Sequence, residues 1–128
     1  MNKATQKFLE RAEEAQRASN MALTHKELES AASIAYYGLF FTAQALLQAK
    51  EVAYRHSHSA VIKMYGIEFA KPGMLNPIFH RYLIEARKRE IIADYRLDKK
   101  VNEEQVREML SWAKEFIKAA ENYLKQAF

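Results

Sequence analysis

Cysteine is absent from the 128 residues of this sequence, and glycine and proline are scarce, at three and two residues. Without cysteine the chain has no disulfide framework and no thiolate metal site, which fits a reducing compartment. With so little glycine and proline there is little turn chemistry, whereas the helix-forming residues Ala, Leu, Glu and Lys are abundant. The N-terminal segment is also too polar for a secretory signal. We therefore expect a cytoplasmic, all-α protein without strands.

Charge is absent from one long stretch, residues 30–49. A helix that is apolar on nearly all sides must be buried on nearly all sides, in a protein core or in lipid. The stretch is long enough to span a bilayer, but it carries Ser, Thr and Gln and is largely Ala, which gains little from hydrocarbon. We interpret it as the central helix of a bundle, without membrane contact. Thr24 and Glu27 match a capping box, which predicts a helix over residues 25–52.

Apolar residues at helical spacing predict further helices over residues 3–19, 77–95 and 102–128, and a short one that begins at Ser57 or Ser59 and ends before residue 71. Asn76 followed by proline, and Asn102 followed by Gln105, are typical helix starts. A chain of 128 residues is one domain by length. Short loops favour antiparallel neighbours. We predict a single domain over residues 1–128, an up-and-down four-helix bundle with one additional short helix.

Most of the net charge of +4 arises between residues 81 and 100, where there are seven basic and four acidic residues. One interpretation is a solvated helix face whose charges form local ion pairs, each worth about 0.2–0.5 kcal/mol. The other is a phosphate-binding strip, because Arg presents a planar fork of donors that matches phosphate oxygens. The strip lacks the length and the exposed aromatic residues of a typical nucleic-acid surface. The sequence leaves both interpretations open.

Four segments, in their order and spacing, resemble a known family. They are an Ala-rich first helix, AYYGLF at residues 35–40, SHSAVI at residues 57–62, and an Arg followed by Ala93-Asp94-Tyr95. Over nearly its whole length the chain resembles a small HEPN domain (higher eukaryotes and prokaryotes nucleotide-binding). The resemblance implies a helical bundle that is usually dimeric. It also implies a toxin-antitoxin pair in which a minimal nucleotidyltransferase is the protein partner.

The active members of the family that the chain resembles are metal-independent ribonucleases, whose signature is Arg, four to six residues, then His. Here Asp94 occupies the His position, with Arg89 and Arg87 at the two ends of the allowed spacing. Ribonucleolysis needs a group that takes a proton from the ribose 2′-hydroxyl and returns one near neutral pH. A carboxylate beside Arg accepts weakly, does not donate and repels the phosphate. We therefore expect a degraded nuclease motif.

Helix geometry favours Arg87 as the motif Arg, because Arg87 and Asp94 lie about 20° apart on the helix surface, whereas Arg89 and Asp94 lie about 140° apart. We hypothesise a ligand-binding groove of Arg87, Asp94 and Tyr95, with Arg89 or Lys88 at its rim and His58 from the matched segment 57–62. The alternative is that Asp94 and Tyr95 only end the helix. For His58 we also expect a cap or a hydrogen bond to a backbone carbonyl. A His-x-His pair lacks further zinc ligands, so we expect no metal and no cofactor.

Two functions follow from these observations. The first is a non-enzymatic binding protein that pairs with a nucleotidyltransferase and binds nucleotide or RNA phosphate through the Arg87 region. The second is an active metal-independent ribonuclease toxin that uses Arg87 and Asp94, with His58 of another helix or subunit supplying the proton. We expect two apolar surfaces to remain uncovered, the outer face of helix 25–52 and the region of Ile91 and Ile92, which fall off the main apolar stripe of helix 77–95. They predict a symmetric homodimer that joins two basic segments into one groove.

Overall fold

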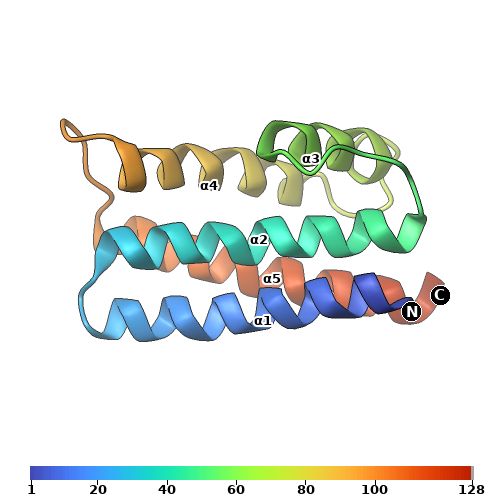
Figure 1. The fold of residues 1–128 in the computed structure, drawn as a ribbon, viewed down its shortest axis with the longest axis horizontal. Helices are drawn as coiled ribbons and strands as arrows, with labels where there is room; N and C mark the ends of the chain where they lie inside the picture. The colour runs from blue at the N-terminus through green and yellow to red at the C-terminus, as the bar shows by residue number, and fades with distance from the viewer. Residues whose placement is uncertain (128) are drawn as a thin grey trace.

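Helices are the only regular elements of the computed structural model, which describes residues 1–127. In chain order they are α1 (Lys3–Thr24), α2 (Leu28–Lys50), α3 (His58–Tyr65), the π-helical turn η1 (Gly66–Ala70), α4 (Ile78–Tyr95) and α5 (Glu103–Ala127). Figure 1 shows α1, α2, α4 and α5 running side by side, each antiparallel to the long helix before it, with α3 beside the start of α4. The prediction of an all-α bundle with four long helices and one short helix is confirmed.

The central helix is α2, which packs against α1, α3, α4 and α5. Its buried residues lie on all its sides and include Tyr36, Leu39 and Leu46, none of which is exposed. Within residues 1–127, α2 is the one helix long and apolar enough to cross a membrane, but 72% of its apolar window is buried inside the bundle. Its apolar surface is therefore already covered by protein, as in a core helix.

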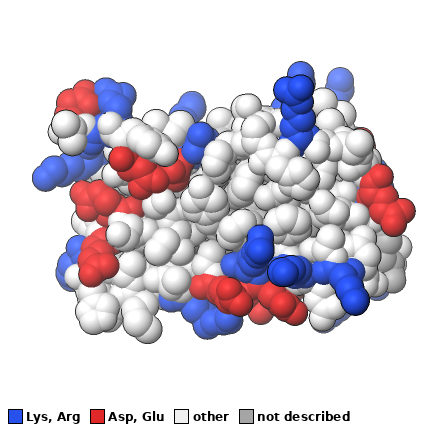
Figure 2. Space-filling model, in the orientation of Figure 1, with Lys and Arg blue, Asp and Glu red and all other residues white. Residues whose placement is uncertain are grey.

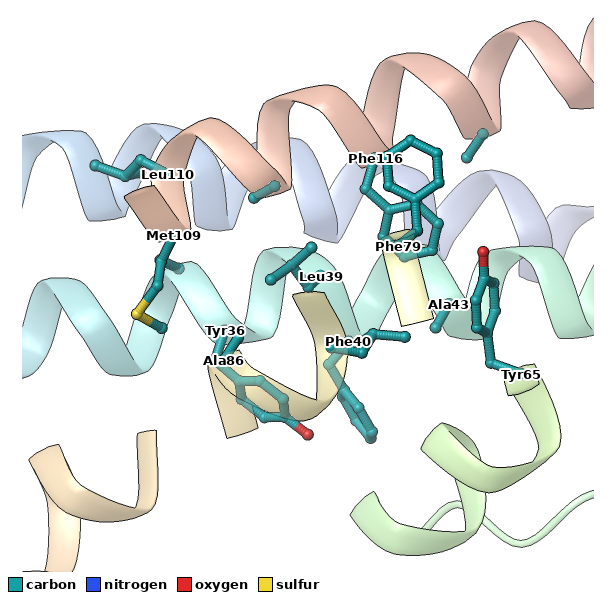
Figure 3. Close-up of a cluster of buried hydrophobic side chains, with 14 of the residues drawn as sticks. Tyr36, Leu39, Phe40, Ala43, Tyr65, Phe79, Ala86, Met109, Leu110 and Phe116 are labelled. Carbon is teal, nitrogen blue, oxygen red and sulfur yellow. The ribbon is translucent and has the colours of Figure 1, made fainter. Parts of the chain in front are cut away.

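Stacked aromatic rings join α3, α4 and α5. Phe116 of α5 stacks on Phe79 of α4 with 5.0 Å between the ring centroids, and it meets Tyr65 of α3 edge-on at 5.3 Å. Figure 3 shows these three rings close together beside Ala43 of α2. Burial of each ring contributes about 1.5–3 kcal/mol. The cluster fixes the position of the first turn of α4. It therefore also fixes the direction of this helix and the position of Arg87, two turns further on.

The predicted capping box at Thr24 is wrong. Thr24 is the last residue of α1, and its hydroxyl donates to the carbonyl oxygen of Asn20 at 3.0 Å. The next helix, α2, begins only at Leu28, and Glu27 precedes it without a side-chain cap. The helix predicted over residues 25–52 is therefore shorter at both ends.

In turn, α1 is longer than the helix predicted over residues 3–19, because its last turn is buried. Ala22 and Leu23 continue the apolar stripe and are 8% and 6% exposed. Ser19 is also buried, and its hydroxyl donates to the carbonyl oxygen of Ala31 at 2.7 Å. Ser19 thus joins α1 to α2 instead of ending α1. Burial of one more turn outweighs a local cap, which is worth about 1 kcal/mol.

The other helix starts agree with the sequence analysis. Ser57 Oγ accepts a hydrogen bond from the backbone amide three residues later, at 3.4 Å. The side chain of Asn76 accepts one from the amide two residues later, at 2.9 Å. At the start of α5, Asn102 accepts from the amide of Gln105 at 2.8 Å, and Gln105 accepts from the amide of Asn102 at 3.0 Å. This reciprocal capping box fixes where the connection from α4 ends.

Candidate functional site

A chain of polar side chains runs along the last turns of α4, where α4 packs against α2. The guanidinium of Arg87 forms an ion pair with the carboxylate of Glu90. Glu90 in turn shares a hydrogen bond with the carboxyl group of Asp94, one helical turn further on. Asp94 Oδ2 also accepts a hydrogen bond from the hydroxyl of Ser33 of α2 at 3.0 Å. We call these four residues, Ser33, Arg87, Glu90 and Asp94, the polar chain.

Glu90 is the residue that the sequence analysis missed. It is only 2% exposed. Burial, first, and the hydrogen bond with Asp94 raise the pKa of Glu90 to about 7, while the positive charge of Arg87 acts in the opposite direction. At neutral pH this carboxyl group therefore exchanges a proton. Helix geometry could have revealed it, since Glu90 lies about 60° from Arg87 and about 40° from Asp94 on the same face.

His58 adjoins the polar chain through two tyrosines of α2. The ring nitrogen Nδ1 of His58 is 2.7 Å from the hydroxyl of Tyr36, and Nε2 is 3.5 Å from that of Tyr37. The guanidinium carbon of Arg87 lies 5.7 Å from the centroid of the Tyr36 ring. Burial, and then the charge of Arg87, lower the pKa of His58. The expected cap or backbone bond of His58 is wrong, because Ser57 makes the cap and the imidazole turns toward the tyrosines.

Arg89 lies apart from the polar chain. Its guanidinium carbon is 4.6 Å from the centroid of the Trp112 ring, and its side chain is 12% exposed. It donates to the backbone oxygen of Gln105 at 3.0 Å and pairs with Glu108 at 3.1 Å. Arg89 therefore ties α4 to α5. Of the five residues expected to bind a ligand, the structure brings Arg87, Asp94 and His58 together.

Tyr95 follows the polar chain at the end of α4 and is 72% exposed. Beyond it, the guanidinium of Arg96 pairs with Asp98 at 2.6 Å. Figure 2 shows acidic and basic side chains mixed around this end of the molecule. Of the basic residues between 81 and 100, Arg87, Arg89 and Arg96 are thus held in local ion pairs. Within residues 1–127, no group of three His, Asp or Glu side chains has a geometry that could hold a metal ion.

The fold and the polar chain define a class of protein, a small helical bundle with an arginine-centred polar cluster near the end of one helix. The sequence profile of the HEPN domain matches residues 5–123. The chain belongs to the HEPN family, and the resemblance read from the sequence is confirmed.

The chain is also similar to several named proteins. The chain is 34% identical over 99 residues to a protein of Methanocaldococcus jannaschii named "Putative toxin MJ0605", a match that covers 77% of this chain and 73% of the relative. It is 30% identical over 119 residues to "Putative toxin MJ0142" of the same organism, with 93% and 80% covered. A "UPF0332 protein" of Thermotoga maritima is 31% identical over 110 residues, with 84% and 80% covered. These names support a toxin-like HEPN protein.

Proposed function

We propose that this HEPN protein is the toxin-like member of a toxin-antitoxin pair, that it binds nucleotide or RNA phosphate through Arg87, and that it does not cleave RNA. The observation that carries the proposal is the bonding of Asp94. At the His position of the family signature, its carboxylate accepts a hydrogen bond from Ser33 at 3.0 Å and lies beside a second carboxyl group, that of Glu90. A carboxylate held in this way is poorly suited to the two proton transfers that His performs.

Arg87 retains the means to bind an anion. Its side chain is 28% exposed. Only one of its terminal nitrogens bonds to Glu90, while a guanidinium has five N–H donors. Because the pKa of Glu90 is raised to about 7, this carboxyl is neutral in a large fraction of molecules at neutral pH. The charge of Arg87 is then only partly compensated, and a phosphate can compete for it.

Homodimer formation is part of the proposal and is supported by the outer face of α4. Ile84, Ile91 and Tyr95 follow one another at helical spacing and are 38%, 37% and 72% exposed. Ile92, which we expected in the same patch, is partly buried and packs against the core. A two-fold axis along this face would bring two polar chains near each other.

Light scattering at micromolar concentration should give twice the mass of 14.9 kDa, and Ile91→Asp should give the monomer. A monomeric unmodified protein would contradict this part.

The binding claim is tested with a short single-stranded RNA and the purified protein in the presence of a chelator. We expect binding without cleavage, and at least tenfold weaker binding by Arg87→Ala. The matched control is Arg107→Ala, which removes the same charge from an arginine of α5 that is 61% exposed and pairs with Glu103. Equal binding by both variants would contradict a role for Arg87. Metal-independent cleavage that disappears in Arg87→Ala would contradict the non-enzymatic function.

Glu90 favours a second candidate, a metal-independent ribonuclease in which Glu90 performs the proton transfers. A carboxyl whose pKa is raised to about 7 is present in both protonation states near neutral pH. Its side chain is 3% exposed, so Arg87 would first have to move from Glu90 to the phosphate. Cleavage that is lost in Glu90→Gln and kept in Asp94→Asn would support this candidate. An inactive unmodified protein would exclude it.

The nucleotidyltransferase partner is proposed from the family resemblance and the toxin names of the relatives. An adjacent reading frame for a minimal nucleotidyltransferase would identify the candidate, and co-expression with a tag on that protein tests it. We expect a stable complex that contains the HEPN chain. Failure of the two proteins to co-purify at physiological salt would favour a stand-alone role.

A further inference from the structure

A groove of about 470 Å³ lies between η1 and the start of α4, away from the polar chain. Three cations line it: Lys63 of α3, Lys71 at the end of η1, and Arg81 of α4. All three side chains are exposed, and within residues 1–127 none of them has a hydrogen-bond or ion-pair partner. No carboxylate lines the groove. Figure 2 shows cationic side chains projecting over α3 and the start of α4 from a largely uncharged surface.

The floor of the groove is apolar. Ile67, which is 46% exposed, and Pro77 both line it. Volumes of about 300–1,000 Å³ are typical of small-molecule sites, in which apolar walls carry a few convergent polar groups. Unpaired cations that share one groove repel each other, and an anion relieves this repulsion. The groove therefore suits a ligand with both a flat apolar part and negative charge.

The backbone under the groove departs from regular helix. In η1 the amide of Lys71 donates to the carbonyl oxygen of Gly66, five residues earlier, at 2.8 Å. Such π-turns inside helices are often found at functional sites. A Cβ atom on Gly66 would lie 2.6 Å from Cε1 of His80, so only glycine allows the imidazole to lie this close. His80 Nε2 donates to the carbonyl oxygen of Ile62 at 3.0 Å. His80 also lines the groove, and this bond holds its imidazole in place there.

A second groove on the molecule provides a comparison. It lies between α1 and α5, has a volume of about 360 Å³, and is also lined by three cations, Arg17, Lys114 and Lys118. Two carboxyl groups, those of Glu13 and Glu121, line it as well. Burial and the neighbouring Glu13 raise the pKa of Glu121. The negative charge of this pair offsets the cations there, whereas the groove at η1 has no such compensation.

We infer that the groove between η1 and α4 binds the phosphate groups of a nucleotide, either free or as one unit of an RNA strand. Lys63, Lys71 and Arg81 contact the phosphates, and the base lies on Ile67 and Pro77. The site is separate from Arg87, which lies six residues beyond Arg81 and about 120° away around α4. If the phosphates belong to an RNA strand, the inference rests on the proposed function. If they belong to a free nucleotide, it does not.

The test compares two triple variants that lose the same charge. The groove variant carries Lys63→Ala, Lys71→Ala and Arg81→Ala, and the control carries Arg17→Ala, Lys114→Ala and Lys118→Ala. The probes are ATP, measured by calorimetry, and a fluorescein-labelled RNA of ten nucleotides, measured by anisotropy, both at low salt. We expect at least tenfold weaker binding by the groove variant and less than a twofold change in the control. The slope of log K against log salt for RNA should also become shallower by about 2.

The two probes distinguish the sources of the phosphate. Loss of ATP binding supports a free-nucleotide site, and loss of RNA binding by a protein that never bound ATP supports an RNA site. Equal weakening in both triple variants would show a general charge effect and overturn the inference. Unchanged binding in the groove variant, or no binding of either probe by the unmodified protein, would also overturn it. The inference would likewise be overturned if the groove variant lost the binding of an acidic protein partner but kept its binding of nucleotide and RNA.

Three single variants separate the groove from the polar chain and from misfolding. If Arg87→Ala abolishes RNA binding and the groove variant loses neither ATP binding nor RNA binding, the inference fails and the proposed function stands. The opposite pattern supports the groove and removes Arg87 from the proposed function. Should the triple variant lose its helical circular dichroism, the single variant Arg81→Glu replaces it, because this side chain is exposed and without a partner. Gly66→Ala, which must displace His80, is expected to weaken binding while leaving the cations in place.

Discussion

Glu90→Gln should remove a large pH dependence of stability. In the folded protein the pKa of Glu90 is raised from 4.5 to about 7, chiefly by burial. The folded state therefore binds this proton more tightly than the unfolded chain does. The stability that Glu90 contributes is fully present below pH 4.5 and is lost as the pH rises through about 7. Since one pKa unit corresponds to about 1.4 kcal/mol, the loss is about 3 kcal/mol.

Glutamine keeps the size and hydrogen-bonding groups of the side chain but has no titrating proton. The difference in unfolding free energy between the unmodified protein and Glu90→Gln should therefore change by about 3 kcal/mol between pH 4.5 and pH 8, with the variant gaining relative stability as the pH rises. The measurement is urea denaturation followed by circular dichroism at a fixed protein concentration. A difference that stays constant across this range would refute the buried, proton-exchanging carboxyl.

The control is Glu85→Gln, which removes a negative charge from the same helix at a position that is 47% exposed. Because Glu85 pairs with Arg89 at 3.3 Å, this variant reports the effect of losing one negative charge and one surface ion pair, without the loss of a buried carboxyl group. A carbon-detected NMR titration of the Glu90 carboxyl gives its pKa directly. If that titration shows an ordinary glutamate while the stability difference still changes with pH, the cause lies in another group.

Three further predictions concern the bundle and the site. Asn102→Ala removes one side of the capping box of α5 and should cost about 1 kcal/mol of unfolding free energy in urea denaturation, whereas a change below 0.3 kcal/mol would contradict the role of the cap. Phe116→Ala removes the ring at the centre of the aromatic cluster and should cost about 3–5 kcal/mol, measured in the same way. Arg87→Ala should raise the pKa values of both Glu90 and His58, because the charge of Arg87 lowers both. An NMR titration in which only one of them rises would show that Arg87 does not link them.

Periodicity was sufficient to predict the helices but not all of their ends. The starts at Asn102 and Ser57 follow from local chemistry, because the capping side chain and its amide lie within three residues of each other. The junction of α1 and α2 does not, because Thr24 is a suitable cap in sequence but lies in a turn that packs on the core. At this junction Thr24 could either cap the second helix or end the first, and burial of the last turn of α1 in the core favours the second conformation. This burial cannot be read from the local sequence pattern.

The candidate site was predictable only in part for a similar reason. Spacing along one helix placed Arg87 and Asp94 on one face, and the structure agrees. The roles of Glu90 and His58 depend on burial and on residues from another helix, such as Tyr36. In the sequence Glu90 lies among many charged residues, and a glutamate in such a segment is expected to be solvated unless its burial is known. The partner of an imidazole likewise becomes clear only when the packing of α2 against α3 is seen.

The sequence contains a single tryptophan, Trp112, and its surroundings make it an optical reporter of one contact. Its ring stacks on Tyr82 with the planes 7° apart and the centroids 4.8 Å apart, and Arg89 lies against it. Emission excited at the tryptophan band therefore comes entirely from the contact between α4 and α5. A ligand that only occupies the surface of α4 should leave this emission unchanged. A ligand that shifts α4 along α5 should change its intensity or wavelength, without any label being attached.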